Sequence, residues 1–411
     1  MTSVGKPRTI DPARLPMSRT TIASPRSRSS RSHIDGECAC SPRLGSSNVD
    51  RAPSRSSARA ASAPEAKPST SRSGATTIRA SPSKSPRKST RAHSIARRGA
   101  GHSVLRLGLC CTFLSEPIRF RTTTVRYAST LSLKERSRFY NEIALHNAEM
   151  LARAVKWCKA HAIGAFRVLS GFLPIFTHPE VGWTMDDDAW RGVRSALRAI
   201  REHARVADIR LSFHPDQFVV LGSATPSVVT SSLRELEYLA EVAELIGAEQ
   251  MTIHGGGAQG GKLASLERLV EGIACLSPRA RSRIALENDD RVYTVEDLLP
   301  VCHALGVPLI YDVHHHRCLP DALSVERATE LAAETWHGRE PWTHVSSPAR
   351  GWGSSDARSH ADFVKPADLP REWLSRTMTV DVEAKAKEVA VLRLRKWLDL
   401  LSTAPRSTAK Q

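Results

Sequence analysis

The feature that most constrains this chain is an alternation of short apolar stretches with longer amphipathic ones, from Val104 to about Leu401. The short stretches have the length and composition of buried strands, and the long ones repeat apolar residues at helical spacing, as at Ile143, Met150 and Leu151. The expected strands are residues 104–110, 165–170, 209–213, 250–254, 283–287, 309–316, 342–346 and 377–382. The expected helices are residues 133–161, 187–207, 228–246, 263–275, 295–305, 325–335, 356–373 and 384–401.

This succession of strand and helix units predicts a single (β/α)8 TIM-type barrel over residues 104–402, because both the number of units and the total length fit that fold. A doubly wound open sheet is the structural alternative, but no Gly-rich dinucleotide turn follows the first strand. In a barrel the carboxyl ends of all strands face one mouth, so residues there are the candidates for chemistry.

The first 103 residues have a different composition, rich in Ser, Arg, Pro and Ala, and we expect a disordered basic tail. Residues 403–411 are expected to be a disordered C-terminus. The tail is interpreted either as an arm that holds DNA without sequence preference, or as a dispensable tail, a targeting segment or sequence upstream of a true start near Val104.

The positive charge of the chain is concentrated in this tail. Residues 1–100 hold 20 Lys and Arg against 5 Asp and Glu, a net charge of +15, whereas the other 311 residues hold 39 against 37, a net charge of +2. A DNA-binding face on the barrel must therefore be a local patch.

Cysteine use and hydropathy suggest the compartment. Eight cysteines in 411 residues, several in apolar stretches such as Cys110 and Cys111, do not resemble a disulfide scaffold. No apolar run approaches the roughly 20 residues of a membrane span. We expect a soluble, cytoplasmic protein of bacterial type, associated with the nucleoid when acting, without a membrane partner and monomeric.

Metal-ligating side chains recur where the expected strands end. They are His214, His254, Glu287, Asp312, His315, His344, His360 and Glu383. Each alone has an ordinary explanation: His214 could be a core histidine bonded to a carbonyl, and Glu287 could pair with Arg291. Five imidazoles and three carboxylates at one mouth would be costly to desolvate without cations, so two or three divalent metals are implied, with Glu287 or Asp312 suited to bridging.

Such a cluster favours phosphoryl chemistry, in which the cations neutralise the charge of a phosphodiester during hydrolysis. A metal-dependent sugar isomerase is an alternative use of the same barrel, although carboxylates and a lysine usually outnumber imidazoles there. A non-enzymatic DNA- or metal-binding protein, with structural strand-end residues, is a third.

The motifs at these positions together resemble the UV damage endonucleases, relatives of endonuclease IV, over about Leu105 to Leu401. The motifs are His214-Pro215-Asp216-Gln217-Phe218, Ile253-His254-Gly255-Gly256-Gly257, Leu286-Glu287-Asn288-Asp289, Tyr311-Asp312-Val313-His314-His315, His344-Val345-Ser346-Ser347-Pro348, His360-Ala361-Asp362 and Asp381-Val382-Glu383-Ala384-Lys385. The resemblance implies incision of damaged double-stranded DNA immediately 5′ to a UV photoproduct, leaving a 3′-hydroxyl and a 5′-phosphate. An abasic-site endonuclease of the same barrel class is the alternative.

The resemblance also implies a divalent cluster, three Mn²⁺ with Zn²⁺ or Mg²⁺ as substitutes, held by the eight strand-end residues given above. Glu287, His254 and His214 are expected to act most directly in catalysis. Gln217 and Phe218 match a pair that probes DNA at the lesion, since a planar ring can stack on a base.

His178 matches the family only by position, and we assign it as a candidate metal or phosphate contact.

Three positions, in two places, depart from the family's pattern. Relatives often carry Tyr and Asn near the end of the first strand, where this chain has Leu109 and Phe113, and a lysine that is modified in some relatives is here Trp342. These changes bear on the lesion range and on the fine tuning of the centre, but they do not touch the eight ligands. His314 and His316 are expected to contact DNA or to face solvent.

Overall fold

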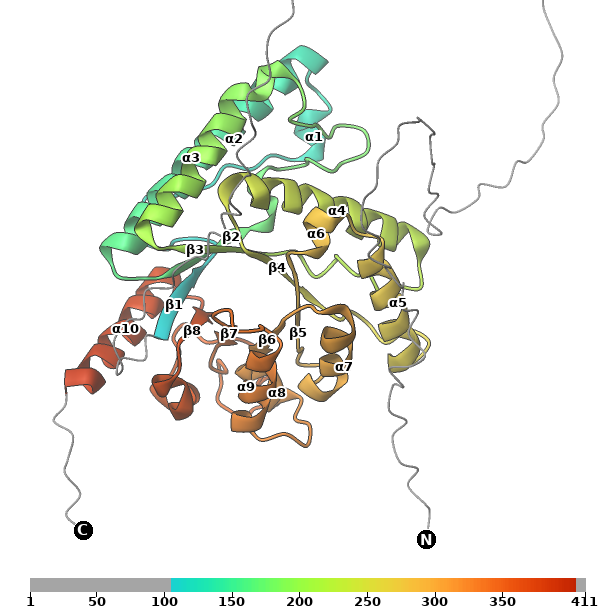
Figure 1. Cartoon of the computed structure of the whole chain (residues 1–411). Helices are drawn as coiled ribbons and strands as arrows, with labels where there is room; N and C mark the ends of the chain where they lie inside the picture. Colours follow the sequence, from blue (N-terminus) through green and yellow to red (C-terminus); the bar gives the residue numbers. More distant parts are fainter. Residues whose placement is uncertain (1–104, 404–411) are drawn as a thin grey trace, which may run out of the picture. The chain divides into compact units, whose positions relative to one another are not determined.

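The computed structural model describes residues 105–403, and they form a closed barrel of parallel strands with helices on its outside (Figure 1). The strands are β1 (Leu105–Cys110), β2 (Ala165–Leu169), β3 (Arg210–His214), β4 (Gln250–His254), β5 (Ile284–Glu287), β6 (Leu309–Asp312), β7 (Trp342–Val345) and β8 (Met378–Val382). They pair in sequence order, and β8 pairs with β1 to close the barrel. The predicted fold class is confirmed.

Helices follow the strands as the apolar spacing predicts. The longer ones are α2 (Leu133–Ala160), α3 (Arg191–Ala207), α4 (Pro226–Ile246), α5 (Lys262–Ala274), α7 (Val295–Leu305), α9 (Val325–Glu334) and α10 (Lys387–Thr403). Short helices α1 (Val125–Ala128), α6 (Pro278–Arg281) and α8 (Val313–Cys318) were not predicted. Among residues 105–403, no helix combines the length and apolar character needed to cross a membrane.

Alternation along each strand divides the side chains between two environments. One set packs outward against the helices and belongs to the large core, as Leu211, Leu286 and Tyr311 do. The other set points into the barrel. Its apolar members Ala165, Ala285, Ile310 and Trp342 form a separate small cluster with Trp336.

This inner cluster is the floor of the site. Ala285, Ile310 and Trp342 each lie two residues before a candidate ligand, so they share its face of the strand. The face of the Trp342 ring receives the guanidinium of Arg210, 4.4 Å from the ring centroid. The barrel interior below these candidate ligands is therefore filled by packed side chains, and the ligands lie at the open end of the barrel.

Two expectations about secondary structure are wrong. No α-helix forms at residues 356–373, where the chain carries Pro366 and Pro370 and makes only the 3-10 turns η4 (Pro366–Asp368) and η5 (Arg371–Ser375). Proline lacks the amide hydrogen that a helix needs and disfavours helical geometry in the residue before it.

The sixth strand also stops at Asp312 instead of continuing to residue 316. The Asp312 carboxylate accepts a hydrogen bond from the His315 amide at 2.8 Å and so caps the short helix α8.

The two predicted tails fall largely outside the described residues. The disorder expected of residues 1–103 and 404–411 therefore stays a prediction. Thr403, which we assigned to the C-terminal tail, is the last residue of α10.

Candidate metal centre

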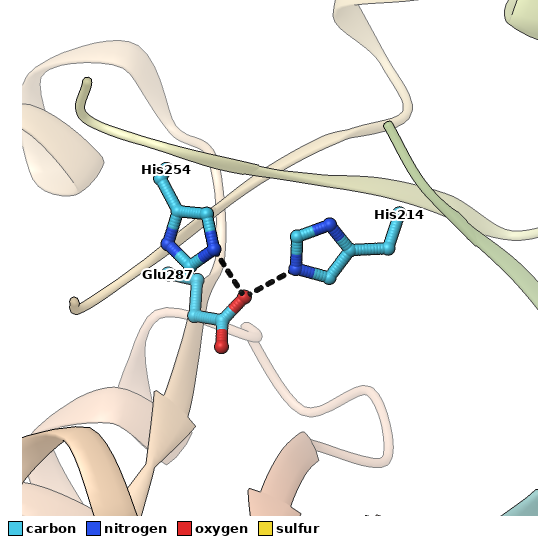
Figure 2. A group of neighbouring side chains, drawn as sticks. All are labelled: His214, His254 and Glu287. Atoms are coloured by element: carbon cyan, nitrogen blue, oxygen red, sulfur yellow. Dashed lines mark hydrogen bonds and ion pairs between the residues drawn. The ribbon is translucent and has the colours of Figure 1, made fainter. Parts of the chain in front are cut away.

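Glu287, at the end of β5, is the hub of the candidate site. Its side chain is fully buried, and four imidazoles surround it. His214 Nε2 lies 2.8 Å and His254 Nε2 3.7 Å from Oε2, and both rings point at that oxygen in Figure 2. His344 Nδ1 lies 2.8 Å and His315 Nδ1 3.4 Å from Oε1. Each carboxylate oxygen of Glu287 therefore faces a different pair of histidines.

The candidate ligands fall into two groups that share Glu287. His214, His254 and Glu287 form one, and Glu287, Asp312, His344 and Glu383 form the other, with the donor atoms of each group within 4.8 Å of one another. His360 extends the second group, because its Nδ1 lies 3.6 Å from Glu383 Oε2. All eight residues predicted from strand ends are thus gathered at one mouth of the barrel.

The ionisable groups of this cluster shift one another's pKa values. Burial acts to raise the pKa of Glu287, but the imidazoles of His344, His254 and His214 outweigh it and hold the pKa well below its usual range. Burial acts to lower the pKa of His315, yet the carboxylates of Asp312 and Glu287 raise it to about 9. Protonated imidazoles therefore supply part of the positive charge that balances the buried carboxylates.

His254 behaves differently from His315. Burial lowers the pKa of His254 despite the nearby carboxylate of Glu287, so its neutral form is favoured. A neutral imidazole has a free nitrogen lone pair, which is the form that binds a metal.

Two buried polar atoms of the cluster lack a hydrogen-bond partner among the described residues, Asp312 Oδ2 and His254 Nδ1. Buried carboxylate oxygens are rarely left in this state, and a cation would satisfy the Asp312 oxygen directly. The donor set of imidazole nitrogens and carboxylate oxygens suits Mn²⁺ or Zn²⁺. The residues present therefore fit a divalent metal cluster.

Asn288 fixes the geometry of two ligands and was not predicted as a functional residue. Its side chain exchanges two hydrogen bonds with the Asp312 backbone, both 2.9 Å, and its carbonyl lies 2.9 Å from His315 Nδ1. A His315 Nδ1–H donating to that carbonyl leaves Nε2 as the ligand nitrogen. The only signal in the sequence was that Asn288 directly follows Glu287.

Arg167 on β2 is a second residue that sequence reasoning missed. Its Nη2 donates to Glu383 Oε1 at 2.5 Å and its Nε to Asp381 Oδ2 at 3.1 Å. Although burial acts to lower its pKa, the carboxylates of Glu383 and Asp381 raise it well above the usual value, so the group stays charged. A charged residue inside the otherwise apolar strand 165–170 was the available signal.

The residues proposed to contact DNA lie in loops and are not among the grouped metal ligands. Gln217 and Phe218 are exposed in the loop after β3, and the Phe218 side chain is 77% exposed. His178 Nδ1 accepts hydrogen bonds from the amides of Glu180 and Val181, so it serves its own loop. The DNA roles of all three stay predictions.

The expectation that His314 and His316 face solvent is wrong, because both are buried. His316 lies between the Tyr311 hydroxyl, at 2.6 Å, and the Asp321 carboxylate, at 3.0 Å. The ring of His314 packs between His360 and Trp352. The cause is α8, whose turn carries these side chains inward where an extended strand would have alternated them.

The departures at the first strand have a structural basis. Leu109 and Phe113 are both buried, and Phe113 packs edge-on against Trp157 with ring centroids 5.2 Å apart. Neither side chain is available to a DNA substrate in this arrangement. Trp342 is likewise buried, and its place in the floor supplies no oxygen or charged nitrogen to the cluster.

Comparisons with known proteins identify the family of this chain. The model of the UV-endonuclease UvdE family matches residues 105–407. A UV DNA damage endonuclease of Nostoc sp. is 31% identical over 304 residues, which cover 71% of this chain and 89% of the relative, and one from Bacillus cereus strain G9842 is 30% identical over 287 residues, covering 67% and 87%. The crystal structure of SacUVDE is 29% identical with a TM-score of 0.65 and covers 73% of this chain and 99% of that one. The chain therefore belongs to the UV-endonuclease UvdE family, a family of nucleases.

Proposed function

We propose that this protein is a metal-dependent DNA repair endonuclease that hydrolyses the phosphodiester 5′ to UV photoproducts and leaves a 3′-hydroxyl and a 5′-phosphate. The observation that carries the proposal is the buried Glu287 hub, with imidazoles on both carboxylate oxygens and further acids beside it. Membership of a UV-endonuclease family supports DNA as the substrate.

The eight strand-end residues would hold the cations, for which we propose three Mn²⁺. Eight protein donors exceed the roughly four used by one zinc-type site, and Glu287 is shared by the two groups. When bound, such a cluster supplies an activated water and neutralises the phosphate and the leaving oxygen. Contacts among Glu287, His254 and His214 hold their ligand atoms in place before DNA binds, so these side chains need little reorganisation during the reaction.

Recognition of the lesion is assigned to the loop after β3. Phe218 offers an exposed ring to a base, and Gln217 beside it offers donor and acceptor groups to the base left without its partner. The loop follows His214 directly, so it places the probing side chains next to the first group of ligands.

One incision experiment tests the proposal. Purified protein with Mn²⁺, Mg²⁺ or Zn²⁺ is incubated with end-labelled duplexes that carry a pyrimidine dimer, an abasic site or no lesion. We expect a cut immediately 5′ to the dimer with a ligatable 3′-hydroxyl. Cutting of the abasic duplex alone would contradict the proposed substrate, and no cutting with any metal would contradict the proposed activity.

Replacing Phe218 by alanine is expected to lower kcat/KM on the dimer duplex by about 5- to 150-fold, because stacking of a base on an aromatic ring contributes about 1–3 kcal/mol. Steady-state incision kinetics measure the change. Val206→Ala is the matched control, since Val206 is also exposed but lies at the end of α3, ahead of β3. An equal loss in both variants would remove Phe218 from lesion recognition.

Deleting residues 1–100 is expected to leave incision within about twofold while flattening the dependence of DNA binding on salt, because the deleted segment carries most of the excess positive charge. Binding to undamaged duplex is measured across a salt series. An unchanged slope would leave the tail without a role on DNA.

A further inference from the structure

A buried ion-pair network joins Arg167 to Glu383, a member of the second ligand group, and to Asp381, which is not a predicted ligand. Arg167 comes from β2, whereas its partners Asp381 and Glu383 come from the end of β8. These strands are not neighbours, since β1 lies between them. The guanidinium therefore crosses the inner face of β1.

Gly108 makes this crossing possible. It lies opposite Asp381 in β8 and opposite Ala165 in β2. A Cβ atom at position 108 would lie 2.0 Å from Asp381 Oδ1 and 3.2 Å from its carboxyl carbon, which no side chain could occupy. The missing side chain leaves room for the carboxylate that holds one edge of the guanidinium.

The other edge of the guanidinium determines how Glu383 presents its oxygens. Oε1 of Glu383 is held by Arg167 Nη2 at 2.5 Å, while Oε2 is directed to His360 Nδ1 at 3.6 Å. Oε1 also lies 3.4 Å from His344 Nδ1, so each oxygen of Glu383 is placed beside a different predicted ligand.

Asp381 connects the same network to His344. The Nδ1 of His344 faces the acids of the cluster, with Glu287 at 2.8 Å and Glu383 at 3.4 Å. Its Nε2 is on the opposite side of the ring, 3.8 Å from Asp381 Oδ2. At this distance the contact is an ion pair and not a hydrogen bond, so Asp381 acts on the orientation of the ligating imidazole through its charge.

We propose that Arg167, with Asp381, is a positioning pair that sets Glu383 and His344 in their ligating orientations, an inference that rests on the proposed metal-dependent function. Arginine suits this task because its planar group offers Nε and Nη2 to two different carboxylates at once. Lysine keeps the charge, but its donors radiate from a single nitrogen and cannot reproduce the geometry in which Nε and Nη2 each face a different carboxylate.

The test is Arg167→Lys, measured first without DNA. Mn²⁺ is titrated into metal-free protein and followed by calorimetry or by the electron paramagnetic resonance of free Mn²⁺. We expect the affinity of the weakest detectable site to fall by about 10- to 100-fold, the usual effect of losing a partner that orients a ligand. With Mn²⁺ at a fixed concentration, kcat for the dimer duplex should fall while its KM stays within about twofold.

Arg210→Lys is the matched control. Arg210 is as buried as Arg167, with side chains 10% and 8% exposed, and it too joins two acids, Glu249 and Glu340. It begins β3, at the end of the barrel away from the ligands. Arg210→Lys should lower the melting temperature but leave Mn²⁺ affinity within about twofold. Equal affinity losses in both variants, or none in Arg167→Lys, would overturn the proposal.

Asp381→Asn decides the matter if Arg167→Lys fails to fold, because the amide keeps the shape of the carboxylate. A fall in Mn²⁺ affinity supports the positioning role, and wild-type affinity overturns it. The outcome is separable from that of the proposed function: wild-type protein that binds Mn²⁺ but cuts no duplex would refute the proposed reaction only.

Discussion

Glu287→Gln is expected to abolish incision, with a loss of about 10³-fold or more in kcat, while the barrel remains folded. The neutral amide is a poor metal ligand and cannot bridge two groups of donors. Glutamine matches the shape of glutamate, and the surrounding histidines can become neutral when the carboxylate charge is gone. The incision assay measures the loss, and circular dichroism with thermal unfolding measures the fold.

Glu340→Gln is the control for removing a carboxylate from the inside of the barrel. Glu340 pairs with Arg106 and Arg210 near the start of β7, away from the ligands. This variant should unfold at a lower temperature and still incise at near wild-type rate. Full activity in Glu287→Gln, or comparable losses in the two variants, would exclude Glu287 as the hub.

The ligands could be found from the sequence because two rules act together. Apolar strands show where each strand ends, and the barrel brings those ends to one mouth, so His214, His254 and Glu287 could be grouped although they are far apart in the chain. Their geometry could not be found in the same way. That Glu287 has imidazoles on both oxygens depends on the register and tilt of the strands.

Residues that support the ligands were harder to predict. Arg167 is a lone charge in a strand, and nothing local connects it with Asp381, 214 residues later. Gly108 is meaningful only when its two neighbouring strands are known. Long-range pairs of this kind leave no periodic signal, since periodicity reports burial and not partners.

The run of histidines after β6 shows how a local rule can mislead. An extended strand would have turned alternate side chains to opposite faces, which favours solvent exposure for some of them. Asp312 instead caps a helix, and the turn buries His314 and His316 while leaving His315 beside Glu287. The cap was visible as an Asp three residues before His315, but it competed with a strong strand pattern.

Removal of metal is expected to abolish incision and to lower the melting temperature by roughly 5–10 °C at neutral pH, because a ligand present at about 1,000 times its Kd stabilises by about 4 kcal/mol. Protein treated with a chelator and dialysed is compared with Mn²⁺-loaded protein. Restored Mn²⁺ should restore both incision and melting temperature.

The gap between the two melting temperatures should widen from pH 6.5 to pH 9. Without metal, His315 has a pKa raised to about 9. Because this is above its unfolded value of about 6.5, its contribution to stability is full below pH 6.5 and is lost as the pH rises through 9. Metal must displace this proton, so Mn²⁺ affinity should rise about tenfold per pH unit over the same range.

Thermal unfolding between pH 6 and pH 9, with and without Mn²⁺, measures this competition between the His315 proton and the metal. His315→Ala should remove most of the widening, because the proton that competes with metal is gone. His303→Ala, which changes an exposed histidine of α7, should leave it intact. A gap of constant size in the wild-type protein would show that protons and metal do not compete at His315, and the residue would then be a structural neighbour of Glu287 and not a ligand.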